Sequence, residues 1–463
     1  MLPALPKPPL RNNGRWIVDA DGRVVIVHGV NMINKMPPDY TPQAAGFMED
    51  DARLLAANGL NVVRVGVIYS AVEPQPGVYD DAYLDSIKGT VAMLARYGIS
   101  SLIDFHQDGW GPAFSCEGFP EWATITDGYP FPGGPFPGLL TDKAVMAAFG
   151  NFWSNTPASD GIGLQDHFAA AWAYAAGKLK DAPGILGWEL MNEPWPGTLL
   201  EQPHKDAHDA LIAFTNRLVS AIRGVDQEHI IWYEPWVLFD WGIPTFMSTI
   251  DDTINPPRIG FAFHNYIPLP NLYDVGWNNA IHYSDDTGAA LLATEFGADI
   301  STAETPAAEL IQAQMNSIDG KMLPAIYWAY WNRTPYVIEN PMTKEVVSSE
   351  AMGIVGDLAL PRVTPNLNDD SLLALTRPYP MFIAGTPLSW SFDPATRVFD
   401  LTYVSDPTLG SNVTEIFVPD LQYPDGFNRS ATGSDVEMST EPQTLKVTAS
   451  GPTQTVQVSI YPV

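Results

Sequence analysis

Two glutamates in this sequence lie in patterns typical of paired catalytic carboxylates. Glu193 belongs to the segment GWELMNEP (187–194) and Glu295 to the segment ATEFG (293–297), and each follows a short apolar run. Cleavage of a glycosidic bond needs one carboxylic acid to protonate the leaving oxygen and a second carboxylate facing the anomeric carbon. In an enzyme that retains configuration, the two groups lie about 5–5.5 Å apart. The pattern predicts a retaining β-glycosidase with Glu193 as general acid/base and Glu295 as nucleophile.

The two carboxyl groups must differ in ionisation to fill these roles. We expect burial and the negative charge of Glu295 to raise the pKa of Glu193, so that Glu193 stays protonated. Glu295 is expected to stay ionised, held by hydrogen bonds. The alternative is that both are ordinary loop glutamates of an acidic protein. Their positions at the ends of two separate predicted strands argue against that alternative.

A (β/α)₈ TIM barrel would bring the two glutamates together, because its chemistry lies at the carboxyl ends of its strands. Eight short runs alternate with helical segments, and most are too continuously apolar for strands with one face in water. A doubly wound open sheet is the alternative, but no Gly-rich phosphate loop follows any run. The predicted strands are 24–30, 61–67, 100–105, 185–190, 230–234, 259–264, 291–295 and 325–331.

Helical periodicity marks four segments of the barrel, and the pattern changes around Pro361. Apolar residues recur at three- and four-residue steps in 49–57, 80–97, 208–223 and 306–318. Later segments are short β-type runs separated by turn residues: 388–392, 398–403, 413–418, 444–449 and 456–461. We therefore predict a catalytic barrel over 1–365 and a C-terminal antiparallel β-sandwich over 366–463. The sandwich is expected to brace the barrel, with sugar binding as the alternative.

Composition limits the partners and the compartment. The formal net charge of −29 would repel nucleic acid and anionic lipid surfaces at long range. The single cysteine, Cys116, excludes an intramolecular disulfide, and no apolar run reaches the roughly 18 residues of a membrane span. The first residues lack the features of a signal peptide and are expected to be a mature N-terminus of a secreted monomer. The histidines show no metal-ligand spacing, so we expect neither metal nor cofactor.

With these motifs at its strand ends, the barrel resembles glycoside hydrolase clan A, and specifically family five, over most of residues 24–335. The family has a motif residue at the ends of strands two, three, four, six, seven and eight, and this sequence has a matching residue at each. In order, the matches are Arg64, His106, Asn192-Glu193-Pro194, His264-Asn265-Tyr266, Glu295-Phe296-Gly297 and a tryptophan.

The resemblance implies a role for each position. Asn192 would bind the sugar 2-hydroxyl, Tyr266 and Arg64 would orient Glu295, and His264 would tune Glu193. A tryptophan on strand eight would form the floor of the first sugar subsite, and the position fits Trp331 first and Trp328 second. Taken singly, Arg64 could be a core ion-pair partner, and His106 or His264 a hydrogen-bonded core histidine. Glu234, in a Glu-Pro pair that lacks the preceding Asn, is expected to be a rim or supporting carboxylate.

Two segments resemble the endoglycoceramidases within that family. They are DFHQDGWG (104–111) and NMINKMPP (31–38), and the resemblance implies that Lys35 and Asp108 bind the glucose nearest ceramide. The alternatives are a solvated loop charge for Lys35 and a turn-capping carboxylate for Asp108. Aromatic and apolar residues crowd three loops after strands three, five and six: 114–137, 236–241 and 266–273. They could line a slot for two alkyl chains, stack on sugar rings or pack against each other.

The expected activity is cleavage of the β-glycosidic bond between oligosaccharide and ceramide. The expected partners are a glycosphingolipid or another β-glycoside and, transiently, lipid assemblies, with no nucleic acid. Rival activities within the family are a β-glucosidase for glucosylceramide or a steryl glucoside, and an endo-β-glucanase. A rival from another class is a glycolipid-binding protein without catalytic activity, which the intact pair of glutamates argues against.

Overall fold

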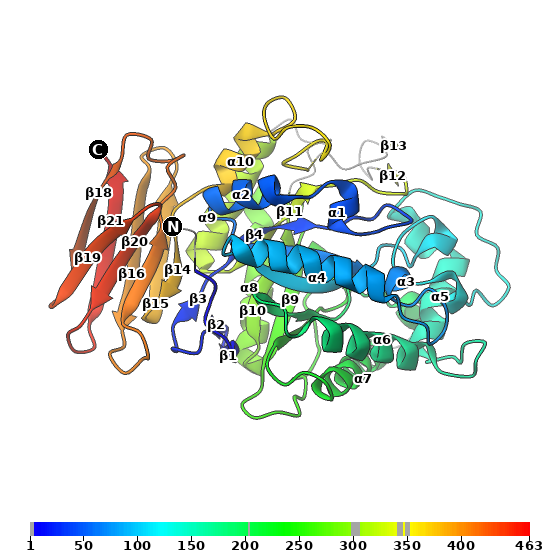
Figure 1. Ribbon diagram of the computed structural model, residues 1–463. Coiled ribbons are helices and arrows are strands. Elements are labelled where there is room, and N and C mark those ends of the chain that lie inside the picture. The colour runs from blue at the N-terminus through cyan, green and yellow to red at the C-terminus, as the bar shows by residue number, and fades with distance from the viewer. Residues whose placement is uncertain (1–3, 202–203, 298–305, 340–345, 348–351) are drawn as a thin grey trace.

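The computed structural model describes residues 4–201, 204–297, 306–339, 346–347 and 352–463. A barrel and a β-sandwich lie side by side, with the N-terminal strands between them (Figure 1). None of the described helices is long and apolar enough to cross a membrane.

Eight parallel strands close into the predicted TIM barrel. Every residue of each strand is buried, as expected when helices cover the outside and side chains fill the inside. The strands in spatial order are β10 (Ala290–Phe296), β11 (Ala325–Trp331), β4 (His28–Met32), β5 (Val62–Ile68), β6 (Ser100–His106), β7 (Ile185–Glu189), β8 (Ile230–Tyr233) and β9 (Ile259–Asn265).

The strand that we expected over 24–30 is wrong as a single element. Val24–Val25 forms β3 and pairs with the C-terminal part of the chain, at Ile383 and Phe382. Only His28–Met32, strand β4, belongs to the barrel. The whole run is buried in both settings, so its apolar character could not reveal that the chain passes from one sheet to the other.

The four expected helices are present within a few residues of their predicted bounds. They are α2 (Glu49–Ala57), α4 (Asp81–Arg96), α7 (His204–Arg223) and α9 (Ala307–Lys321). The Asp80 side chain caps α4 by accepting a hydrogen bond from the Tyr83 amide. The sequence prediction had not assigned the other helices: α1 (Pro42–Ala45), α3 (Tyr69–Val72), α5 (Lys143–Trp153), α6 (Leu164–Leu179), α8 (Tyr273–Thr287) and α10 (Asp369–Leu375).

Short 3₁₀ turns and one small hairpin form parts of the loops around the barrel. Their bounds are η1 (Pro112–Phe114), η2 (Glu121–Ala123), η3 (Gly138–Thr141), η4 (Gly197–Glu201), η5 (Val237–Trp241) and η6 (Pro270–Leu272), with the hairpin formed by β12 (Ile338–Glu339) and β13 (Val346–Val347). Of these, η5 contributes most to the site described below.

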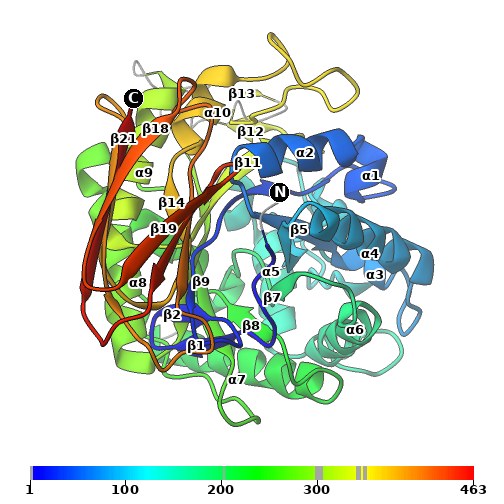
Figure 2. The same cartoon turned by 60° about the vertical axis from the view of Figure 1, so that its left-hand side comes forward.

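The predicted antiparallel β-sandwich is present, and both ends of the chain build it. One sheet has the order β1 (Arg11–Asn13), β2 (Trp16–Val18), β3, β14 (Tyr379–Ile383), β17 (Val413–Phe417), β20 (Thr444–Ala449) and β19 (Val436–Glu441). The other has the order β15 (Gly385–Asp393), β16 (Val398–Ser405), β21 (Thr455–Pro462) and β18 (Phe427–Thr432). Residues 11–25 therefore tie the start of the chain to the sandwich (Figure 2).

The sandwich packs against the amino-terminal end of the barrel. Side chains from the first halves of the barrel strands, such as Val62, Leu186 and Ile230, share one buried cluster with Ile383 and Phe417 of the sandwich. A buried ion pair joins the two parts as well. Asp319 of α9 binds Arg377 at 2.6 Å and accepts a hydrogen bond from the Trp390 indole at 3.1 Å. This contact lies at the end of the barrel opposite the strand ends that carry the catalytic motifs.

The ion pair between the two parts gives a stability prediction. Asp319→Ala leaves the Arg377 guanidinium, whose side chain is 1% exposed, without its carboxylate. We expect the free energy of unfolding to fall by about 3–5 kcal/mol. Denaturant unfolding monitored by fluorescence measures this loss. Glu441→Ala, which removes a partly exposed partner of Lys446, is the matched control and should cost no more than about 1 kcal/mol. Equal losses in the two variants would contradict a special role for the buried pair.

Candidate active site

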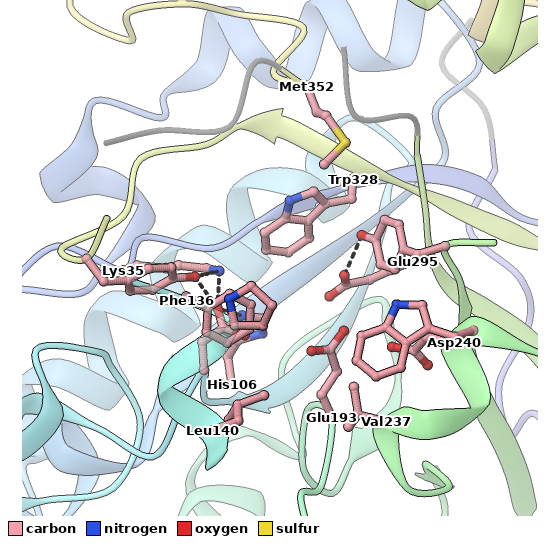
Figure 3. Close-up of a pocket in the computed structure, with 15 residues that line it drawn as sticks. Lys35, His106, Phe136, Leu140, Glu193, Val237, Asp240, Glu295, Trp328 and Met352 are labelled. Atoms are coloured by element: carbon pink, nitrogen blue, oxygen red, sulfur yellow. Dashed lines mark hydrogen bonds and ion pairs between the residues drawn. The ribbon is translucent and has the colours of Figure 1, made fainter. Parts of the chain in front are cut away.

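Glu193 and Glu295 meet at the carboxyl ends of the barrel strands (Figure 3). Glu295 lies near the end of β10, and Glu193 follows β7. One carboxylate oxygen of each lies within 4.8 Å of the other. That separation suits a retaining glycosidase, in which the second carboxylate attacks the sugar directly, and leaves little room for the extra water of an inverting enzyme.

Arg64 of β5 lies beneath this pair and binds several carboxylates at once. Its guanidinium donates to Glu295 Oε1 at 2.5 Å and to Glu189 Oε2 at 2.5 Å. It also lies 3.1 Å from Asp104 Oδ2 and 3.3 Å from Glu234 Oε1. Burial is the largest influence on Glu189 and Glu234, and the pKa of each carboxyl is raised. Arg64 is therefore a core ion-pair partner and a direct ligand of Glu295 at the same time.

Glu295 is held through both carboxylate oxygens. Arg64 binds Oε1, and the Tyr266 hydroxyl donates a hydrogen bond of 2.7 Å to Oε2. Tyr266 follows β9, and its own amide donates to the Asp240 carbonyl at 2.9 Å. Two donors from different strand ends fix the rotation of the carboxylate. The geometry that the resemblance implied for Arg64 and Tyr266 is present.

Glu193 lies in a different electrostatic environment. Its Oε1 lies 2.9 Å from Nδ1 of His264. Burial, the negative charge of Glu295 and then that of Asp108 raise the pKa of Glu193 to about 8. The direction agrees with the sequence prediction and keeps Glu193 protonated near neutral pH. The backbone of Glu193 has φ of 42°, in the left-handed region, and its amide donates to Glu234 Oε2 at 3.0 Å.

Asn192 is fixed by protein contacts on both sides of its amide. Its oxygen accepts from Arg64 at 2.9 Å, and its nitrogen donates to the Gln107 carbonyl at 3.0 Å. Gln107 in turn donates to the carbonyls of Asn192 and Glu193 at 2.9 and 3.0 Å. Gln107 had been noted in the sequence only as part of a motif. It ties the ends of β6 and β7 together, and the contact of Asn192 with a sugar hydroxyl stays a prediction.

Lys35 and Asp108 line the same pocket and form an ion pair. Tyr336 donates a hydrogen bond of 2.8 Å to Asp108 Oδ2, and Lys35 Nζ lies 4.5 Å above the Trp328 ring. Burial raises the pKa of Asp108, but the charges of Lys35 and His106 outweigh it and hold that pKa well below its usual range. The side chain of Lys35 is 2% exposed, which excludes a solvated loop charge.

His106 and Trp328 form the wall next to that ion pair. His106 Nδ1 lies 2.7 Å from Asp104, and the imidazole is parallel to the Trp328 ring with centroids 5.6 Å apart. Burial lowers the pKa of His106, but the carboxylates of Asp104 and Asp108 raise it to about 9. Trp328 lines the pocket, whereas Trp331 is not among the lining residues. The structure thus places the second of the two predicted tryptophans, rather than the first, in the pocket, and its role as the sugar floor stays a prediction.

The remaining wall of the pocket, which has a volume of about 180 Å³, is largely apolar. Four of its apolar side chains come from loops that the sequence had marked as hydrophobic, and two come from elsewhere. The four are Phe136, Pro137, Val237 and Trp241, and the other two are Leu140 of η3 and Met352. Two polar residues of this pocket, Asp240 and Tyr336, were missed. Asp240 had been counted only as part of an apolar segment, and Tyr336 lies beyond the last barrel strand, where no motif marked it.

Three groups of side chains could place donor atoms around a cation. They are His106–Asp108–Glu117, Glu189–Glu234–His264 and Glu193–His264–Glu295. Lys35 pairs with Asp108 and lies 3.6 Å from Glu117 in the first group, and Arg64 binds carboxylates of the other two. Lys35 and Arg64 compensate part of the negative charge of these groups. Acid/base and nucleophilic carboxylates suffice for glycoside cleavage.

Comparison with known proteins agrees with this geometry. The cellulase (glycosyl hydrolase family 5) model matches residues 18–334, and the glycoside hydrolase family 5 C-terminal domain matches residues 377–460. Endoglycoceramidase I of Rhodococcus hoagii is 29% identical over 97% of this chain and 87% of its own length. Endo-glycoceramidase II of Rhodococcus sp. gives a TM-score of 0.79 as a lactosyl-enzyme intermediate, with 28% identity and 99% of both chains covered. The ganglioside GM3 complex of the same enzyme gives a TM-score of 0.78, with 26% identity and 100% of both chains covered.

The electrostatics of the pair can be tested without any substrate. Because the charge of Glu295 raises the pKa of Glu193, Glu295→Gln should lower that pKa below about 8. Carboxyl carbon NMR titration of glutamate-labelled protein measures the shift. The spectrum of Glu193→Gln assigns the resonance by its disappearance. A Glu193 pKa that stays the same or rises in Glu295→Gln would contradict the coupling.

Proposed function

Because the chain belongs to glycosyl hydrolase family 5, we propose that it is an endoglycoceramidase that releases the intact oligosaccharide from ceramide. The observation that carries the proposal is the placement of the Lys35–Asp108 pair in one pocket with Glu193 and Glu295. The relatives named endoglycoceramidase, which match nearly the whole chain, support it.

The reaction proceeds in two displacements at the anomeric carbon. Glu295 Oε attacks that carbon while the bond to the ceramide oxygen breaks, and Glu193 gives its proton to the leaving oxygen. Arg64 and Tyr266 hold the attacking carboxylate in place. Water then gives a proton to Glu193, its oxygen bonds to the anomeric carbon, and the bond to Glu295 breaks. The oligosaccharide leaves with retained configuration.

The polar wall of the pocket would bind the sugar next to ceramide. Lys35 and Asp108 supply a donor and an acceptor that are already oriented, which lowers the entropic cost of binding hydroxyl groups. Trp328 supplies the aromatic floor, and His106 stacks behind it. A steryl glucosidase or glucosylceramidase would need only one sugar subsite here. An endo-β-glucanase would need aromatic subsites on both sides of the glutamates.

The apolar wall would receive the alkyl chains of ceramide. Val237 and Trp241 belong to η5, and the opposite face of that turn borders a second, apolar hollow of about 420 Å³. Exposed apolar side chains surround this region. They come from η4, η5, the loop after η5, the residue before η6, η6 itself and the start of α8: Leu200, Trp241, Ile243, Phe246, Leu269, Leu272 and Val275. An exposed apolar surface of this kind suits a substrate whose aglycone is a lipid.

The same surface supports transient contact with lipid assemblies. The net charge of −29 opposes electrostatic attraction to anionic lipids, so contact would depend on these apolar side chains. Action as a monomer stays a prediction from the sequence, as does secretion of a mature form.

Lactosylceramide in mild detergent tests the activity, with both products identified by mass spectrometry. We expect intact lactose and ceramide. Glu193→Gln should slow release about 10²–10⁴-fold, because the ceramide oxygen is a poor leaving group that needs an acid. Glu295→Gln should abolish turnover. Galactose with glucosylceramide, or cleavage of a β-glucan alone, would overturn the proposal.

The apolar wall predicts a separate effect of lipid length. Trp241→Ser should lower kcat/KM on long-chain lactosylceramide roughly ten-fold, because a half-exposed apolar contact is lost. Activity on a soluble aryl β-lactoside should be unchanged. Leu388→Ser, an equally exposed apolar residue on the sandwich, is the matched control. Equal losses on both substrates would show that Trp241 acts on the sugar side instead.

A further inference from the structure

Asp240 is a buried carboxyl group at the acid side of the site for which family motifs supply no role. It lies in η5, lines the catalytic pocket and is 3% exposed. Figure 3 shows it on the same side of the pocket as Val237. The Tyr266 amide donates to its carbonyl at 2.9 Å, which ties the turn that carries Asp240 to the residue that holds the nucleophile.

Asp240 converges with Glu193 on the same imidazole nitrogen. Nδ1 of His264 lies 2.9 Å from Glu193 Oε1 and 3.6 Å from Asp240 Oδ2. The Asp240 and Glu193 carboxyl groups are also hydrogen-bonded to each other. Two carboxyl groups that interact this closely, one of them buried, cannot both be ionised without a large repulsion, so one of them must hold a proton.

The surroundings decide which group keeps the proton. Burial and then the charge of Glu193 raise the pKa of Asp240 well above its usual range, whereas the pKa of Glu193 is about 8. The hydrogen bond between the two groups raises the pKa of Asp240 and lowers that of Glu193, so Asp240 is the group that keeps the proton. The titratable and charged groups around the pair, from β5 to β10, are Arg64, His106, Asp108, Glu234, His264 and Glu295.

We infer that Asp240 is a positioning residue for Glu193, and that its neutral carboxyl donates a hydrogen bond to the Glu193 carboxylate. This role rests on the proposed glycosidase mechanism but not on ceramide as the leaving group. When Glu193 has given its proton to the leaving oxygen, the Asp240 O–H stabilises the charge that remains. When water returns a proton to Glu193, that charge disappears. The Asp240 proton stays on Asp240 throughout.

Three substitutions separate this role from a structural one. Asp240→Ala removes the donor, whereas Asp240→Asn keeps a neutral donor in nearly the same volume, and Asp286→Ala removes an exposed aspartate on α8 as the control. The substrates are aryl and alkyl β-lactosides whose leaving groups range from activated dinitrophenolate to unactivated alcohol. Labelling of Glu295 by an activated 2-fluoro glycoside, which needs no acid, checks that each site is folded.

For Asp240→Ala we expect kcat/KM on alkyl lactosides to fall about 10- to 100-fold, because a hydrogen bond to a developing charge is lost. Labelling by the activated inactivator should be nearly unchanged. The hydrogen bond lowers the pKa of Glu193, so its loss should move the basic limb of the kcat/KM profile to higher pH. Asp240→Asn should restore both the rate and the limb to near those of the wild type.

Two results would overturn the inference. One is an Asp240→Ala variant whose basic limb and dependence on the leaving group match those of the wild type. The other is an Asp240→Asn variant as impaired as Asp240→Ala, which would show that Asp240 works as a charged group. Failure of wild-type protein to cleave lactosylceramide, with these lactosides still hydrolysed, would overturn the endoglycoceramidase proposal alone.

Discussion

A single buried guanidinium organises the catalytic end of this barrel. The Arg64 side chain is fully buried and binds acceptors from four other strands: Asn31, Asp104, Glu189 and Glu295, with Glu234 just beyond β8. An unpaired charge in this position would cost several kcal/mol, so the acceptors and the guanidinium require each other. The planar guanidinium also fixes directions, because its five donors point along set lines. These contacts of Arg64 hold together strand ends that are far apart in the sequence.

The two catalytic glutamates differ because of what surrounds them. Glu295 receives hydrogen bonds from Arg64 and Tyr266, which fix the orientation of its carboxylate. Glu193 is partly buried, faces other carboxyl groups and contacts His264. The same side chain therefore serves as nucleophile at one strand end and as acid at another. Asp240 adds to this difference between the two glutamates. Because Asp240 is neutral, it adds no charge to the site before the reaction, and it can stabilise the Glu193 carboxylate after Glu193 has lost its proton.

The sequence predicted the barrel and the motif residues because both depend on local chemistry. Continuous apolar runs mark strands buried on two faces, and Glu193 and Glu295 directly follow or end such runs. Long-range pairing was harder to infer. The run 24–30 divides between two sheets, and nothing in its composition marks the point of division. Helix α6 was missed because its many buried alanines cover several faces and give no clear amphipathic period. Trp328 and Trp331 lie on one strand, and only the closed barrel distinguishes them.

The two ends of the barrel differ in the kind of side chains that they bury. At the amino-terminal end, the sandwich and the first halves of the strands share a dry apolar cluster, closed by Asp319 and Arg377. At the carboxyl-terminal end, charged groups are brought into contact at a cost in stability, and loops expose Trp241 and Phe246. Buried carboxyl groups that repel one another persist only on a scaffold stabilised elsewhere. The sandwich therefore contributes to catalysis indirectly, because its packing stabilises a barrel whose other end concentrates like charges around the scissile bond.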